Sequence, residues 1–216
     1  WTLNGLKSSN SALLFKLLVD KNALISSTAL RLLEPLAKEN ETIRVKLQET
    51  LLQTWENVSH EQVLQMALSA YVLDQTASHQ LLADIADRFG TFPLIRDAVM
   101  SSLQNQEFVF LERLLKSPQW QKQQADKEIF LEMLTTAIVH KRDAKEMTAL
   151  LTMLDVDKAS FGWQQKVILT AMSIQGKNRK LKPIQLASAP TLFGRSDVES
   201  SYQSRLQTAA LLFEWE

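Results

Sequence analysis

The sequence predicts an all-α protein, built as a right-handed α-solenoid of about five antiparallel helix pairs. Apolar residues recur at helical spacing along nearly the whole chain. Gly and Pro occur only five times each, which leaves few of the turns that β-hairpins need. Capping and breaking residues divide the chain into segments of about 10–18 residues, and connections that short favour antiparallel neighbours.

The first part of the chain carries five apolar stripes of helical spacing. They span Leu13–Leu18, Leu24–Leu36, Ile43–Trp55, Val63–Leu73 and Leu81–Phe89. We expect Pro35 to kink or end the second helix. Ser59 and Gln62 have the form of a capping box before the fourth helix. Ser78 is expected to cap the fifth helix, which Gly90 would end.

Five further stripes follow in the same style. They span Leu94–Leu103, Phe108–Leu115, Ile129–Val139, Met147–Leu154 and Trp163–Ile174. Pro93 suits the first turn of a helix, whereas Asn105 and Pro118 mark breaks. Asp143–Glu146 has the form of a second capping box, and Gly176 is expected to end the last helix of the series.

The helices also recur with a regular period. Matching pairs near the middle of every second helix lie about 38, 31, 35 and 35 residues apart, which is typical of two-helix repeats. We therefore expect a repeat array over residues 1–176. Residues 177–216 are expected to form an irregular segment and a capping helix, begun by Ser196–Glu199 and reaching Phe213. The alternative is an irregular helical bundle whose segments show this spacing by chance.

Four segments carry a resemblance to a known family, in the order Trp1–Leu6, Ala29–Leu36, Leu94–Leu103 and Phe110–Leu115. Over roughly residues 1–155 the chain resembles the armadillo-like HEAT-repeat region of certain large exported bacterial proteins. In that family the region lies between a sorbosone-dehydrogenase-like β-propeller and a c-type cytochrome domain with a Cys-x-x-Cys-His motif. The resemblance implies a helical spacer or docking region in a periplasmic or extracellular, haem-containing oxidoreductase. Because the chain starts at Trp1 without Met, we expect it to be part of a longer protein.

The composition argues against several functions. Lys plus Arg equals Asp plus Glu at 24 each, so a nucleic-acid partner is not expected without a strongly segregated charge. The basic residues of 177–182 are interpreted as a solvated loop. The chain has no Cys, which excludes disulfides, thiolate zinc sites and a Cys nucleophile. No apolar stretch reaches the length of a membrane span.

No catalytic, cofactor-binding or metal-binding residue is assigned, and this part of the chain is not expected to be an enzyme. The three histidines, His60, His79 and His140, lie near expected helix ends and lack metal ligands at helical spacing. Asp155 and Asp157 resemble the start of a calcium loop, but the Gly and the distal Glu of such a loop are missing.

The expected function is therefore a scaffold that presents a surface to another protein domain, within the same chain or on another. Trp120 is a candidate partner contact because an aromatic residue in a polar segment suits an interface. It could equally pack across its own turn. The alternative function is a HEAT-like DNA-binding or DNA-repair module, which would use Trp55, Trp120 and Trp163 as aromatic contacts.

Overall fold

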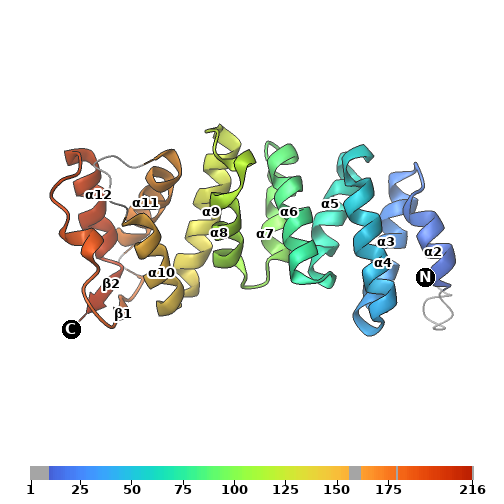
Figure 1. Cartoon of the computed structure of the whole chain (residues 1–216), viewed down its shortest axis with the longest axis horizontal. Coiled ribbons are helices and arrows are strands. Elements are labelled where there is room, and N and C mark those ends of the chain that lie inside the picture. The colour runs from blue at the N-terminus through green and yellow to red at the C-terminus, as the bar shows by residue number, and fades with distance from the viewer. Residues whose placement is uncertain (1–9, 156–161, 179, 216) are drawn as a thin grey trace. The chain divides into compact units, whose positions relative to one another are not determined.

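The computed structural model describes residues 10–155, 162–178 and 180–215. Over these residues the chain is all-α apart from two strands of three residues each (Figure 1). It divides into two compact units, Trp1–Gln104 and Asn105–Glu216. The boundary predicted after residue 176 falls inside the second unit, because the helix ending there packs against the next one. The Trp1–Leu6 segment of the family resemblance lies outside the described residues.

The described part of the first unit contains six α-helices and two 3-10 turns. They are α2 (Ser11–Leu18), α3 (Ala23–Glu39), α4 (Glu41–Thr54), η1 (Trp55–Asn57), α5 (His60–Ser69), η2 (Ala70–Val72), α6 (Gln75–Phe89) and α7 (Pro93–Ser102). Polar side chains begin most of these helices: Asn10, Asn22 and Asn40 each accept hydrogen bonds from backbone N–H groups of the following turn. Local sequence therefore sets most of the helix starts.

Two of the predicted signals in this unit are confirmed. The Ser59 hydroxyl accepts from the Gln62 backbone N–H at 3.4 Å, while the Gln62 side chain accepts from the Ser59 backbone N–H at 3.0 Å. This is the reciprocal arrangement of a capping box. Pro93 is the first residue of α7, where its missing N–H costs no intrahelical bond.

Two other signals do not end or begin a helix as expected. Pro35 lies inside α3, which continues to Glu39, so it does not end the helix. Pro35 and Arg31 are both exposed, so water can satisfy the Arg31 carbonyl that proline leaves without a donor. Ser78 does not cap a helix, because α6 begins at Gln75 and Ser78 is buried within it.

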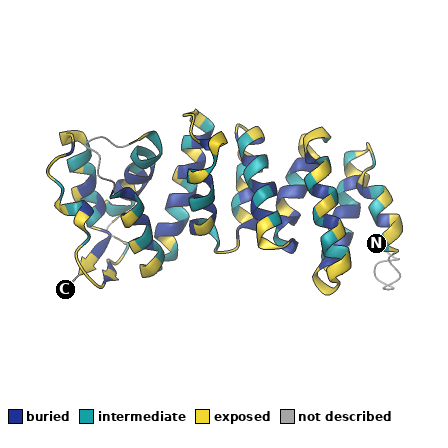
Figure 2. Ribbon diagram, viewed as in Figure 1, coloured by how far each residue is buried: buried dark blue, intermediate teal, exposed yellow. Residues whose placement is uncertain are grey.

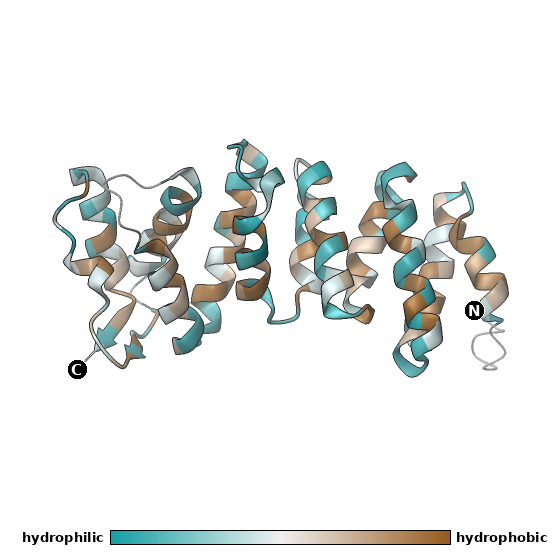
Figure 3. Cartoon of the chain, in the orientation of Figure 1, coloured by the Kyte–Doolittle hydropathy of each residue, from teal (hydrophilic) through white to brown (hydrophobic). Residues whose placement is uncertain are grey.

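The core of the first unit lies between two rows of helices. α5 contacts both α3 and α7, while α4 contacts α3 and α6. The side chains that are 0% exposed in this core include Leu33, Leu47, Leu51, Val63 and Leu82. Figures 2 and 3 show the buried and apolar residues on the inner sides of the helices. Burial of these stripes supplies the driving force for folding.

A polar network joins neighbouring helices of the same row. The Glu34 carboxylate on α3 accepts hydrogen bonds from the Ser69 hydroxyl at 2.6 Å, from the Tyr71 hydroxyl at 3.2 Å and from the Gln65 amide at 3.4 Å. On the other side of α5, the Ser102 hydroxyl of α7 donates to the Ala67 carbonyl at 2.6 Å. These bonds fix how α3, α5 and α7 pack, because buried polar groups tolerate little displacement from their partners.

The described part of the second unit contains five α-helices, two 3-10 turns and two strands. They are α8 (Glu107–Lys116), η3 (Pro118–Trp120), α9 (Ala125–Lys141), α10 (Ala144–Leu154), α11 (Trp163–Gly176), β1 (Ile184–Leu186), η4 (Thr191–Gly194), α12 (Ser200–Ala210) and β2 (Phe213–Trp215). The break at Asn105 is confirmed, since Gln104 and Asn105 both have positive φ angles, of 47° and 73°. Helical hydrogen bonding cannot pass through two such residues.

The capping box predicted at Asp143–Glu146 is only half formed. The Asp143 carboxylate accepts from the backbone N–H groups of Lys145 at 2.9 Å and Glu146 at 3.0 Å. The Glu146 carboxylate does not return to the N-cap, because it pairs with Lys141 Nζ at 2.6 Å.

The end of the chain differs from the prediction. The capping signal expected to begin at Ser196 does not form: α12 starts at Ser200, its N-cap residue Glu199 makes no side-chain cap bond, and Asp197 is held by Arg195 at 2.6 Å. The helix stops at Ala210, and Phe213 lies in β2, which pairs in parallel with β1. Two parallel strands need a crossover between them, and here α12 provides it. A pairing of three residues between distant segments leaves no periodic signal in the sequence.

Candidate functional site

A groove of about 770 Å³ is lined by residues of α9, α11 and α12 in the second unit. α11 contacts both of the other helices and carries four of the lining residues, Trp163, Lys166, Val167 and Thr170. All four are partly exposed. The groove therefore lies on the solvent side of a helical layer whose opposite side is buried.

One side of the groove is basic and aromatic. Two cations approach the ring of Tyr202 on α12: the Lys166 Nζ is 5.2 Å from its centroid, and the Arg205 guanidinium carbon is 5.3 Å from it. Both distances suit a cation–π attraction. Arg205 also donates from Nη1 to the Thr170 hydroxyl at 3.0 Å. Ring and hydroxyl together hold both charges in place.

The opposite side of the groove is acidic. Glu128 and Glu132 lie one turn apart on α9, and Ile129 beside them is 44% exposed. The Glu128 carboxylate accepts from the Gln123 amide at 2.5 Å. The groove thus combines an exposed apolar side chain with charges of opposite sign on its two walls. Such a lining suits a protein surface better than a phosphate backbone, which needs continuous positive charge.

Trp163 lies at the rim of the groove at the start of α11. Its indole N–H donates to the Gln121 carbonyl at 2.8 Å, and the neighbouring Gln164 amide donates to the Trp120 carbonyl at 2.7 Å. These bonds fix the indole in a half-exposed position. Of the three tryptophans considered in the sequence analysis, Trp163 is the one that lines this groove.

The interpretation of Trp120 as an exposed partner contact needs correction. Its side chain is 1% exposed and packs against Phe130, with ring centroids 5.8 Å apart. The Lys127 ammonium lies 5.5 Å from the Trp120 ring and donates to the Gln119 carbonyl at 2.5 Å. Trp120 therefore anchors the η3 turn onto α9. The polar residues around Trp120 in the sequence do not indicate its exposure, because the single aromatic residue of η3 points into the core.

Each of the three histidines packs against, hydrogen-bonds to, or lies buried among other residues of the chain. His60 at the start of α5 packs against the Phe92 ring at a centroid distance of 4.2 Å. His79 is 6% exposed and lies within α6, not just after its cap as expected. His140 shares a 2.9 Å hydrogen bond with the Gln175 side chain. Within residues 10–155, 162–178 and 180–215, no group of three or more His, Asp and Glu side chains is placed to hold a metal ion.

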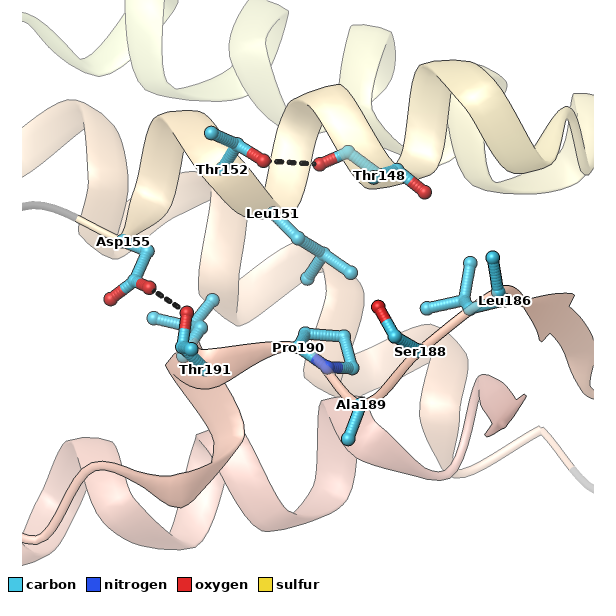
Figure 4. A pocket seen from close by; sticks show the side chains of 11 residues that line it. Thr148, Leu151, Thr152, Asp155, Leu186, Ser188, Ala189, Pro190 and Thr191 are labelled. Atoms are coloured by element: carbon cyan, nitrogen blue, oxygen red, sulfur yellow. Dashed lines mark hydrogen bonds between the residues drawn. The ribbon is translucent and has the colours of Figure 1, made fainter. Parts of the chain in front are cut away.

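A second cavity of about 310 Å³ lies between α10 and the loop of residues 186–192 (Figure 4). Its three threonine hydroxyls, of the four hydroxyl groups that line it, have partners in the chain itself. Thr148 and Thr152 donate to carbonyls of their own helix at 2.8 and 2.9 Å, and Thr191 donates to the Asp155 carboxylate. Asp155 thus holds a loop, and Asp157, which with Asp155 resembles the start of a calcium loop in the sequence, lies outside the described residues. This cavity offers a ligand few donors that are not already used.

In the described part of the chain, no helix is both long enough and apolar enough to span a bilayer. Comparison with models of protein families, with curated proteins and with solved structures finds no match to this chain.

Lys166, Tyr202 and Arg205 were missed in the sequence analysis. Tyr202 and Arg205 have helical i, i+3 spacing, which indicates a shared face. Lys166, however, comes from a helix far away in the sequence. Only the packing of α11 on α12 brings the three side chains together.

Proposed function

We propose that this chain is a non-catalytic scaffold of the HEAT-like solenoid type, whose groove on α9, α11 and α12 binds another protein domain. The observation that carries the proposal is the lining of the groove. Trp, Tyr and Arg are the residues most enriched at the energetic centres of protein interfaces, and Trp163, Tyr202 and Arg205 all line it. Ile129 adds an exposed apolar contact.

The helical arrangement within each unit supports the solenoid part of the proposal. In the first unit α3, α5 and α7 form one row, with α4 and α6 packed on the other side. In the second unit α9, α11 and α12 form a similar row. Repeat proteins stack helix pairs in this way and use the surface of one row for binding. Antiparallel pairing and a right-handed superhelix are parts of this proposal.

The wider setting rests on the sequence resemblance. We place the chain as a spacer or docking region in a larger exported redox protein, with the partner domain in the same chain or in an associated one. The DNA-repair alternative receives less support. Two of its three aromatic candidates are in the core, with Trp55 at 9% and Trp120 at 1% exposure, so neither is available to a base.

Photo-crosslinking in the cells that produce the protein tests the proposal. A benzophenone amino acid replaces Ile129 in the groove or, as a matched control, Ile174, which is 49% exposed on α11 but does not line the groove. We expect irradiation at position 129 to capture a peptide from outside residues 105–215, identified by mass spectrometry. The control at position 174 should give little crosslinked peptide from outside these residues. Equal yields at both positions, or nucleic acid as the captured species, would refute the proposed function.

A further inference from the structure

We propose that the groove recognises an acidic segment of its protein partner, whose carboxylate binds between Lys166 and Arg205 at the edge of the Tyr202 ring. This inference rests on the proposed function and adds the chemical class of the partner. It is argued from the charges on the two walls of the groove, from the hydrogen bonds that hold the two cations, and from the ion pairs that these cations do not make.

The two cations lack an acidic partner within the described part of the chain. In this part of the chain no carboxylate oxygen lies within 4.0 Å of a side-chain nitrogen of Lys166 or Arg205. Both side chains are half-buried and face the same tyrosine ring. A carboxylate that approaches this ring therefore meets two positive charges and displaces no carboxylate of the chain.

The basic wall is held ready for such a contact. Thr170 accepts from the Arg205 guanidinium at 3.0 Å and donates its own proton to the Lys166 carbonyl at 2.6 Å. An arginine side chain has five N–H donors, so one bond to Thr170 leaves the others for a carboxylate. Because the side chains are already positioned, binding costs less conformational entropy than it would with two mobile surface cations.

The acidic wall restricts which partners fit. Glu128 and Glu132 on α9 repel a second negative group and attract a basic one. A phosphate backbone carries its charge at every step and would meet these carboxylates. A free inorganic anion would leave most of the 770 Å³ unfilled. A peptide segment with an acidic residue towards α11 and α12 and an apolar or basic residue towards α9 matches both walls.

Selection from a random dodecapeptide library on the immobilised full chain tests this inference. The wild type should enrich peptides with Asp or Glu at a defined position. Reversal of both charges in K166E/R205E should remove this preference and enrich Lys or Arg instead. The matched control K177E/K180E makes the same change in net charge at two exposed lysines that do not line the groove, and it should keep the acidic preference. Circular dichroism confirms that each variant is folded.

A fluorescein-labelled copy of the best peptide then gives affinities by anisotropy. Arg205→Met should weaken binding by about 10-fold, which lies between the effect of losing an exposed charge pair and that of losing a fully buried one. The same peptide with Gln in place of its acidic residue should bind wild type and Arg205→Met equally well.

The outcomes separate the two proposals. A wild type that enriches no acidic position, or a K166E/R205E variant that keeps the wild-type preference, would overturn the inference about partner class. If position 129 still captures a protein in that case, the groove is an interaction site for a different chemistry. If position 129 captures nothing beyond its own unit, the proposed function fails as well.

Discussion

Gly176 is where the second unit is most sensitive to a single added methyl group. It is the last residue of α11, where the backbone of α12 passes close by. A Cβ built on Gly176 would lie 2.1 Å from the Thr208 carbonyl oxygen and 3.0 Å from the Thr208 carbonyl carbon. Both atoms belong to the backbone and cannot rotate away, so in Gly176→Ala the two helices must separate.

The size of the effect follows from two opposing contributions. Overpacking of a close contact costs about 1–3 kcal/mol. Replacing Gly by Ala stabilises the folded state by about 0.4–1 kcal/mol, because the unfolded chain loses freedom. Taking the middle of each range, we expect Gly176→Ala to lower the free energy of unfolding by roughly 1–2 kcal/mol. Separation of the helices also reduces contacts around Leu206 and Ala209, which are buried in α12.

Urea unfolding, followed by tryptophan fluorescence, measures this change as a lower midpoint with an unaltered slope. Gly194→Ala is the matched control, since no atom lies within 4 Å of a Cβ at that position and its φ is not positive. It should change the free energy of unfolding by less than about 0.5 kcal/mol. If Gly176→Ala is as stable as the wild type, or if the two variants are equally destabilised, the proposed close packing of α11 on α12 is wrong.

Three further predictions concern single side chains. Ser69→Ala removes the shortest hydrogen bond to the Glu34 carboxylate, and we expect it to destabilise the first unit by about 1.5–3 kcal/mol in urea unfolding. Trp120→Ala empties a buried aromatic site and should cost about 3–5 kcal/mol, measured in the same way. The backbone N–H of Glu146 holds the pKa of Asp143 below its usual value. Because the folded pKa is the lower one, this stabilisation is present above the unfolded value of about 3.9 and is lost as the pH falls through the folded pKa. Asp143→Asn should retain the cap but lose this acid dependence, seen as a flatter thermal stability profile below pH 4.

Each of these expectations has an outcome that contradicts it. A Ser69→Ala protein as stable as the wild type would mean that water replaces the hydroxyl at Glu34. Trp120→Ala should lose more stability than Trp163→Ala, because Trp163 is half-exposed; the reverse order would restore an exposed role for Trp120. An acid profile unchanged by Asp143→Asn would assign the acid sensitivity to other carboxylates.

The all-α class was available from the sequence because it depends on local signals. Helical spacing of apolar residues, the box at Ser59 and Gln62, and the first-turn position of Pro93 all operate within one or two turns of a helix. The wrong expectations concern residues whose role depends on their tertiary surroundings. Pro35 is tolerated because it is exposed, and Ser78 is buried inside a helix that begins earlier.

The candidate site was beyond the sequence for the same reason. Lys166 and Arg205 are ordinary helical residues, and they become a pair of cations around one ring only when α11 packs on α12. The polar neighbours of Trp120 left a partner contact and packing across its own turn both open, and packing against Phe130 buries it. The sequence by itself determined which segments are helical, since periodicity and capping are local. Tertiary structure decided which side chains meet in the groove, because contacts between distant segments depend on how helices pack.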